Sequence, residues 1–560
     1  MSQNFARFLA GIIVILVIFA GGFSYAYLFW NHPYMGGYPD VAVHALNALQ
    51  TIQSASITAQ TMLGNSSPRQ FFPFLALETA GLSLVNGLEP LANLWILQEL
   101  LPFLYVALFF IIGRNLTGNA LGGILSAYLT GVVADLPIFS DFAFSRFIST
   151  YTVSFVVFAA VIAFFPHLYR MKNRLLAGIF FFILGTSALF YHHHFGIFRF
   201  AALIIVCGTL IILTKYKNQF RSLIFSKTLL ATLAIISLFF FATNAYQLQP
   251  HLKRYIELGV PSSLYGALFQ QTEELSSLVE YPAATPPLKN STYIIPSPAL
   301  FFSSPLLSFI NIWGVVGAGY ALLYWRKRQS SFAPIITLTC IISAVALQTI
   351  LFALNFVLPA RYLREISALL IPCAAFLLLR LMRFLPKFIG PLIISFFLLT
   401  SALLWFPKMF AFERSFNTSW DNIRFFAWAR TNIPPHAKVL TDPFTFHVLS
   451  ASVLQAQDPW RKMYDPWNDT YTGIENAETE SAKRALMGAE STEKEIELAL
   501  RALCPDFIVI DPPQTTQFFN LRAPKKWYQY PRLFTVSYDS SGASETRILA
   551  LKPTPFVCSH

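Results

Sequence analysis

Charged residues are scarce in this chain of 560 residues, because Asp, Glu, Lys and Arg together make up only 12% of it. Soluble globular domains carry roughly 25% of these residues. Hydrophobic residues make up 55% and aromatic residues 16%, and the mean hydropathy is +0.53. The composition therefore predicts an α-helical polytopic membrane protein.

Cysteine is also infrequent, with five residues in the whole chain. Cys207, Cys340 and Cys373 lie within apolar runs, where a thiol behaves as a small hydrophobic side chain. Cys504 and Cys558 lie in the polar C-terminal segment and could form a disulfide bond if that segment is extracytoplasmic. The sequence leaves this pairing open.

Motifs for nucleic-acid binding are absent, as is a Gly-rich phosphate loop in the C-terminal segment. The net charge of +12 comes from Lys and Arg residues in short clusters between apolar runs. Such clusters set membrane topology and attract anionic lipid headgroups, so no nucleic-acid partner is expected.

Long apolar runs dominate the first 406 residues. Windows of about 19 residues give about eleven candidate membrane spans. The first follows Arg7, is too long for the core of a signal peptide, and is expected to be retained. The candidate spans cover residues 8–30, 91–113, 120–139, 151–169, 175–191, 197–214, 228–247, 298–325, 333–358, 366–385 and 389–406.

Basic residues in the short connections favour one orientation. With the N-terminus in the cytoplasm, Arg7, Arg114, Arg380 and the cluster at 326–328 all fall inside, and the positive-inside rule is satisfied. An odd number of spans then places the C-terminus outside. We expect a multi-pass protein of a bacterial or archaeal plasma membrane.

The chain is expected to divide into a multi-span membrane domain, residues 1–406, and an extracytoplasmic α/β domain, residues 407–560. The membrane domain carries two large outer loops, 31–90 and 248–297. In the second domain, "KVLTD" (438–442) and "DFIVID" (506–511) are typical of buried strands. The stretches "LFTVSYD" and "TRILALK" predict a further hairpin.

An amphipathic helix is predicted before the second of these strands. Ile496, Ala499, Leu500 and Leu503 recur at i, i+3, i+4 and i+7, which is the spacing of one helix face. A parallel βαβ unit with an added hairpin is the simplest assembly of these elements.

The stretch "GGYPDVAVHALNALQ" (36–50) follows the first apolar run and holds a candidate site. Asp40, His44 and Asn47 share one face of the predicted helix. In the simplest interpretation Asp40 caps the helix while the other two face water. The position just outside the first span favours a functional interpretation, because a lipid-borne substrate and a water-borne acceptor would meet there.

Other ionisable residues are expected near the same surface, where they often mark function. "LPARYLREIS" carries Arg361 and Arg364, which either bind a ligand or simply reach lipid headgroups or pair with Glu365. The remaining candidates could form an additional site or a metal site. For the two acids, capping of a loop or pairing with Arg146 is the simpler alternative. These candidates are Asp135, Asp141, His192, His193 and His194.

Several stretches, in order, resemble the GT-C superfamily of membrane glycosyltransferases that use polyprenyl-linked sugar donors. They are an outer acid after the first span, "RQFFPFLALETAGLSLVNGLEPLANLW", "HHHFG", "ARYLRE" and "FFAWARTNIPPHAKVLTD". The resemblance implies that Asp40 is the first-loop acid, a base or metal ligand, and that Arg361 or Arg364 binds the donor phosphate. The chain has neither a DxD in its second outer loop nor a WWD in its terminal domain, which leaves a divalent metal cofactor open.

The implied reaction is an inverting sugar transfer from a polyprenyl-phosphate-linked donor to a glycan, lipid or protein acceptor on the outer face. Asp40, oriented by His44, would accept the acceptor proton, and the two arginines would hold the phosphate. Two other classes stay open: a transporter or flippase of lipid-linked or small solutes, and a non-catalytic assembly protein of the cell envelope.

Overall fold

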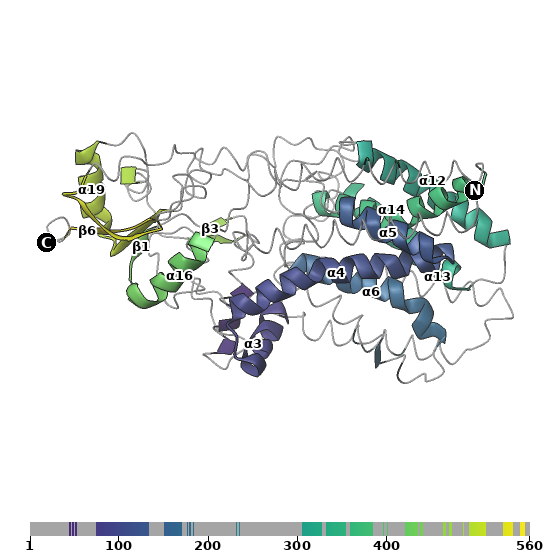
Figure 1. Ribbon diagram of the computed structural model, residues 1–560, viewed down its shortest axis with the longest axis horizontal. Helices are drawn as coiled ribbons and strands as arrows, with labels where there is room; N and C mark the ends of the chain where they lie inside the picture. The colour runs from purple at the N-terminus through teal and green to yellow at the C-terminus, as the bar shows by residue number, and fades with distance from the viewer. Residues whose placement is uncertain are drawn as a thin grey trace, which may run out of the picture. The chain divides into compact units, whose positions relative to one another are not determined.

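The computed structural model describes the chain in several segments (Figure 1). Two compact units are distinguished. The helical unit comprises Met1–Tyr25, Leu97–Gln271 and Thr292–Phe412, and the mixed unit comprises Ala26–Ile96, Thr272–Ser291 and Glu413–His560. The described residues are 44–45, 47–49, 51–52, 74–133, 150–170, 305–327, 332–353, 359–384, 420–434, 437–440, 463–465, 470–472, 485–486, 492–510, 530–540 and 549–554, with single positions 176, 179, 180, 183, 231, 235, 396 and 400.

Six long apolar helices are described, and each coincides with a predicted span. They are α4 (Pro90–Thr117), α5 (Ala120–Val133), α6 (Thr150–Arg170), α12 (Pro305–Lys327), α13 (Phe332–Ala353) and α14 (Pro359–Met382). Apolar windows long enough to cross a membrane lie in α12, α13 and α14, and α4 to α6 contain shorter ones. The chain is therefore a helical membrane protein. The other predicted spans lie outside the described residues, apart from single positions.

Helices α4 and α5 form a tight hairpin. A Cβ atom added at Gly123 would lie 2.7 Å from the Phe110 carbonyl oxygen, so the two helices touch through their backbones. The turn between them requires Gly118, whose φ of +67° lies in the left-handed region. Asn115 Nδ2 donates to the Ala163 carbonyl at 2.9 Å and so attaches α6 to this hairpin.

Helix α14 lies inside the helical unit and contacts α5, α12 and α13. Almost every residue from Glu365 to Leu378 is buried. On the α12 side, Gly314 and Gly317 face α14 directly, and a Cβ atom at Gly314 would lie 2.5 Å from Leu370 Cβ. A Cβ atom at Gly317 would collide with the Cys373 carbonyl oxygen. The small residues therefore let two membrane helices approach at backbone distance.

The first described part of the mixed unit is a helical pair. The segment 44–52 is helical where it is described, and it packs on α3 (Phe74–Asn86) through Ala48, Ala76 and Ala80, with Ile52 at the edge. Helix α3 ends at Gly87, where φ is +71° and the amide donates to the Ser83 carbonyl at 2.9 Å. The chain then enters α4.

The second part of the mixed unit is a four-stranded sheet in the order β1-β4-β6-β5. Its strands are β1 (Val439–Leu440), β4 (Phe507–Ile510), β5 (Phe534–Asp539) and β6 (Leu549–Pro553). Strands β1 and β4 are parallel, and β6 is antiparallel to both β4 and β5. The four predicted strands, their parallel pair and their hairpin are therefore present. A separate antiparallel pair consists of β2 (Met463–Asp465) and β3 (Thr470–Thr472).

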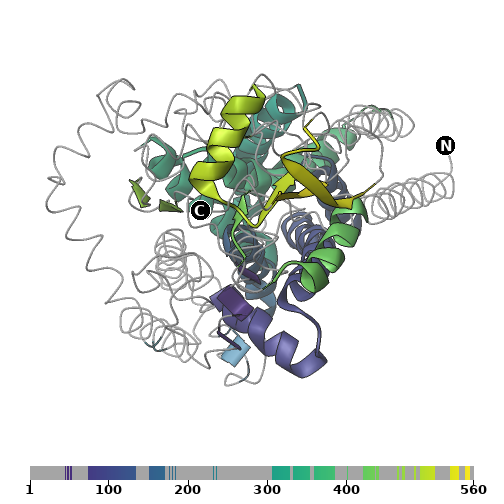
Figure 2. The ribbon, with the colours of Figure 1, turned by 90° about the vertical axis from the view of Figure 1, so that its left-hand side faces the viewer.

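Helix α19 (Glu493–Leu503) lies along one face of this sheet (Figure 2). Its buried residues are the four that the periodicity predicted: Ile496, Ala499, Leu500 and Leu503. They share a hydrophobic core with Ile508, Ile510 and Leu551 of the strands. Burial of this stripe explains why a helix with so many charged residues folds against a sheet.

Helix α16 (Trp420–Asn432) packs on the sheet through aromatic rings. Trp428 lies 4.9 Å from the Tyr538 ring and 6.5 Å from the Phe507 ring, and Phe425 lies 5.4 Å from Tyr538. Successive side chains of a strand point to opposite faces, so Phe507 faces away from the α19 core that Ile508 joins. The register shift between Val536 and Tyr538 lets Phe534 join the α19 core while Tyr538 meets α16.

The start of α19 is a capping box. The Glu495 amide approaches Thr492 Oγ1 at 3.4 Å, and the Glu495 carboxylate accepts from the Thr492 amide at 2.7 Å. Hydrogen bonds from the Thr492 backbone and side chain lower the pKa of Glu495 below its ordinary value of 4.5. The charged form is therefore the one that the folded helix favours.

We expect the N-terminal turn of α19 to loosen in acid because of Glu495. The pKa of Glu495 is lower in the folded protein than in the unfolded chain. Its stabilising effect is therefore complete above its pKa in the unfolded chain and is lost as the pH falls through its pKa in the folded protein. Hydrogen exchange of residues 492–503 in the full chain, corrected for intrinsic rates, should show protection falling as the pH drops below 4.5, the ordinary pKa of the glutamate. Glu495→Gln should flatten this dependence, whereas Glu493→Gln should retain it; equal profiles for both variants would contradict the assignment.

The contact of α12 with α14 predicts a sharp difference between two glycines. Gly317→Leu should destabilise the protein by about 1–3 kcal/mol, because the new leucine side chain would push against the α14 backbone. Gly319→Leu, on the same helix with nothing within 4 Å of the added Cβ, should have little effect. Thermal unfolding in mild detergent measures both, and similar losses would contradict the close contact.

Candidate functional site

The two arginines expected to bind phosphate lie in the first turns of α14. The helix begins at Pro359, several residues before the predicted span at 366, so that "ARYLRE" is helical instead of a connection between spans. Proline is favoured at the first position of a helix, where its missing amide would have no intrahelical partner. Arg361 and Arg364 are thus held on a helix, although their side chains lie outside the described residues.

Glu365 follows these arginines and is buried, with 1% of its surface exposed. Its carboxylate accepts a hydrogen bond from Gln348 Nε2 of α13. A buried carboxylate in an apolar surrounding requires such a polar neighbour, so this hydrogen bond joins α13 to α14.

Helical spacing relates Glu365 to the arginines. Arg361 precedes Glu365 by four residues, which places both on one helix face, and Arg364 is its immediate neighbour. The positive end of the helix dipole lies at the same turn. The first two turns of α14 therefore combine cationic positions, the helix N-terminus and a fixed buried acid, an arrangement that suits a phosphate at the membrane boundary.

The sequence pattern did not reveal Gln348 as the partner of Glu365. The available signal was polarity, because Gln348 interrupts an apolar run of α13, and polar groups at membrane depth usually have a partner. What the pattern lacked was the register that brings α13 beside this turn of α14.

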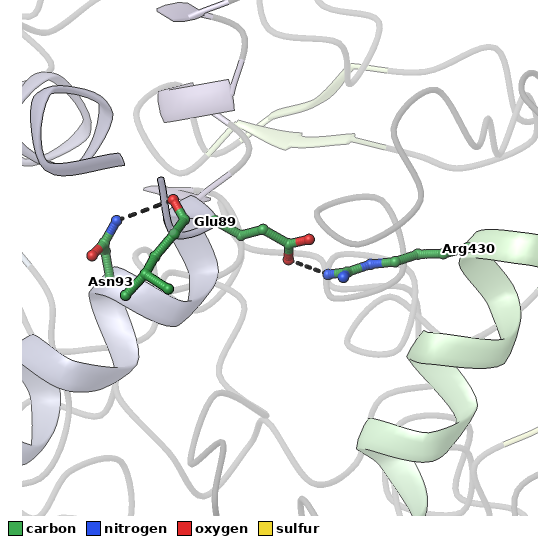
Figure 3. Close-up of polar contacts among 4 residues, drawn as sticks. Glu89, Asn93 and Arg430 are labelled. Atoms are coloured by element: carbon green, nitrogen blue, oxygen red, sulfur yellow. Dashed lines mark hydrogen bonds and ion pairs between the residues drawn. The ribbon is translucent and has the colours of Figure 1, made fainter. Parts of the chain in front are cut away.

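A second polar group lies in the mixed unit at the start of α4. The Glu89 carbonyl accepts from the Asn93 amide at 3.0 Å and begins the helix. The Glu89 carboxylate pairs with Arg430, in the last turn of α16 (Figure 3). Both side chains are about half exposed, 52% and 40% respectively, so this pair is worth no more than about 1 kcal/mol.

Asn93 completes this second group. Its Nδ2 atom donates to Ser83 Oγ at 2.8 Å, and its Oδ1 atom accepts from Asn86 Nδ2 at 2.7 Å. The side chain therefore connects the last turn of α3 to the first turn of α4. The network fixes the angle between these helices, which explains a buried asparagine near a helix start.

The predicted face of Asp40, His44 and Asn47 is described only in part. His44 and Asn47 lie on the helical segment that packs against α3, and both are half-buried. Both take part in further interactions. Asp40 lies outside the described residues.

The other candidates, Asp135, Asp141, His192, His193 and His194, lie outside the described residues as well. Within the described segments, no group of three or more His, Cys, Asp or Glu residues could hold a metal ion. Cys504 forms no disulfide bond with any cysteine in the described segments, and Cys558 lies beyond them.

Three solved structures align with most of the chain at low identities and low TM-scores, while no protein-family model and no curated protein sequence matches the chain. ArnT from Cupriavidus metallidurans bound to undecaprenyl phosphate shares 11% identity and a TM-score of 0.47 over 100% of both chains. ArnT in the apo state gives 12% identity and a TM-score of 0.47, over 98% of this chain and 99% of that one.

The oligosaccharyltransferase of Archaeoglobus fulgidus in complex with Zn and sulfate shares 13% identity and a TM-score of 0.45, over 97% of this chain and 73% of that one. Identities this low concern the fold alone, and the function is proposed from the residues of this chain.

The polar contact inside the helical unit can be tested by replacing Gln348. Gln348→Leu removes a donor from the buried Glu365 carboxylate and should destabilise the protein by about 1–3 kcal/mol. The double variant Gln348→Leu with Glu365→Leu should recover part of this loss, because no buried charge then remains. Thermal unfolding in detergent measures both effects.

Thr349→Val is the matched control, since Thr349 is exposed and hydrogen-bonds only to the carbonyl of its own helix. The destabilisation of the double variant is compared with the sum for Gln348→Leu and Glu365→Leu measured singly. If the two values are equal, Gln348 and Glu365 do not act as a pair.

Proposed function

We propose that the protein is a membrane glycosyltransferase that transfers a sugar from a polyprenyl-phosphate-linked donor to an acceptor on the outer face of the membrane. The observation that supports this most is the start of α14, where Arg361 and Arg364 adjoin the buried Glu365 within the first two turns. Such a turn provides positive charge at membrane depth, which a lipid-borne phosphate requires and an uncharged solute does not.

In this proposal Glu365 orients Arg361. A carboxylate held by Gln348 cannot move freely, so it would anchor one edge of the guanidinium group and direct the other edge outward. Arg364 would supply the second cation. Together they would hold the donor phosphate in bidentate contacts and stabilise the negative charge that develops on it during the reaction.

The proposed reaction is a single displacement at the anomeric carbon. The acceptor oxygen forms a bond to C1 of the sugar while the bond from C1 to the phosphate oxygen breaks, and the polyprenyl phosphate leaves with the bonding electrons. Asp40, oriented by His44, takes the proton of the acceptor. The sugar configuration is inverted, and the arginines neutralise the leaving group.

The proposed orientation places the N-terminus in the cytoplasm and the start of α14 at the outer face. Arg114, at the end of α4, and Arg380, in the last turn of α14, then lie on the cytoplasmic side, as the positive-inside rule requires. In the same proposal the sheet with α16 and α19 belongs to an extracytoplasmic domain formed by residues 407–560.

Replacing the two arginines should weaken binding of the donor lipid. Arg361→Ala with Arg364→Ala removes up to two charge-assisted contacts, each worth about 1.5–3 kcal/mol, so donor affinity should fall at least 10-fold. Mass spectrometry of lipids that copurify in mild detergent should then find a polyprenyl phosphate or its glycoside with the wild type and not with this variant.

Asp40→Asn should behave differently, retaining the lipid while losing transfer to acceptor by about 100-fold or more. Arg114→Ala, an exposed arginine at the other end of the helices, is the matched control and should change neither readout. A wild-type protein that moves the donor lipid across vesicles without transferring its sugar would instead indicate a flippase.

A further inference from the structure

A second basic site lies in the helical unit at the end of α14 opposite Arg361. A cavity of about 180 Å³ lies between the turn joining α4 and α5 and the last turns of α14. Its polar lining consists of Thr117 and Asn119 from the turn and Arg380 and Arg383 from α14. The other described lining residues are apolar, and none of those described is acidic. We call this cavity the α14 C-terminal pocket.

Arg380 is the buried part of the pocket, with 7% of its surface exposed. Its guanidinium carbon lies 3.8 Å from the centroid of the Tyr324 ring and 5.0 Å from that of Phe376. A planar guanidinium held against aromatic faces keeps its charge and its orientation even with little water around it. The pocket therefore contains a fixed positive charge.

The turn between α4 and α5 is rigid. Thr117 Oγ1 donates to the Gly113 carbonyl at 2.7 Å, and Asn119 Oδ1 accepts from the Leu121 amide at 3.1 Å. Trp325 Nε1 donates to the Leu116 carbonyl at 3.2 Å and ties the turn to α12. Asn119 and Leu121 flank the first residue of α5, so the positive N-terminal end of this 14-residue helix adjoins the pocket.

The surroundings distinguish a lipid phosphate from a soluble one. Arg383 is exposed beside the pocket, and so are the apolar side chains of Leu381 and Phe384, at 39% and 77%. Cationic and apolar side chains exposed together are typical of the boundary between headgroups and acyl chains. The volume is well below the 300 Å³ or more of ordinary ligand pockets, so it suits a headgroup and not a complete sugar-linked donor.

We propose that the α14 C-terminal pocket binds the phosphate of an anionic phospholipid, with Arg380 and Arg383 as its cationic ligands. Helix α14 has 24 residues and is about 36 Å long, so this site and the first turn of α14 lie at opposite membrane surfaces. Lipid binding here fastens the ends of α4, α5 and α14 together. The site does not depend on the glycosyltransferase proposal.

Native mass spectrometry of the full chain tests this site. The protein is released from lipid nanodiscs that contain phosphatidylglycerol and phosphatidylcholine in equal amounts. The wild type should retain phosphatidylglycerol preferentially, and Arg383→Ala should reduce that retention about fivefold, the effect of one cation at an anionic membrane surface. Arg380→Lys should also reduce it, because a lysine keeps the charge but loses the planar stacking.

Arg114→Ala is the matched control, because Arg114 is exposed at the end of α4 but does not line the pocket, and it should leave retention unchanged. Unfolding temperatures of all variants, measured in detergent without added phospholipid, show whether each remains folded; under these conditions Arg383→Ala should unfold as the wild type does. Equal retention by wild type and Arg383→Ala, or equal retention of both lipids by the wild type, would overturn the site. Inorganic phosphate at about 10 mM is enough to occupy a weak anion site. If it displaces the lipid, the pocket binds free anions instead of a lipid headgroup.

Discussion

The described helical unit depends on the close approach of α12 and α14. Hydrocarbon offers no hydrophobic force to bring membrane helices together, so they must gain contact through packing. Gly314 and Gly317 provide that contact, because any larger side chain would meet the α14 backbone. With α12 on one side and α13 and α5 on others, α14 becomes an inner helix.

An inner helix with charged ends creates two polar sites. Glu365 and Arg380 are both buried on α14, and each is stabilised differently. Glu365 receives a hydrogen bond from the amide of Gln348, whereas Arg380 lies against the rings of Tyr324 and Phe376. A buried charge without such neighbours would cost roughly several kcal/mol. These partners therefore allow charged side chains to lie inside the bundle. The same arrangement underlies both proposed phosphate sites.

The mixed unit has a different basis, a sheet with a helix on each face. Aliphatic residues join α19 to one face, and aromatic rings join α16 to the other. The Glu89–Arg430 pair and the Asn93 network then connect α16, α3 and the start of α4 within this unit. Because the ion pair is exposed, its role is to set an orientation more than to add stability.

Local patterns in the sequence predicted much of this protein. Composition identified the membrane class, apolar runs located α4 to α6 and α12 to α14, and a period of 3.6 identified the buried face of α19. The four strands of the sheet were also predicted, since strand and helix formation depend on neighbouring residues. The first turns of α14 were placed outside the helix, because arginines and glutamate end an apolar run without ending a helix.

Tertiary structure alone decided which distant residues meet. Gln348 and Glu365, Arg380 and Tyr324, and Glu89 and Arg430 carry no signal of partnership in their own segments. The bulge that turns Tyr538 toward α16 is equally invisible, because one shifted residue changes the face of a strand without changing its composition. Periodicity states which face of an element is buried, but the register between elements, set by packing of the whole fold, decides what that face contacts.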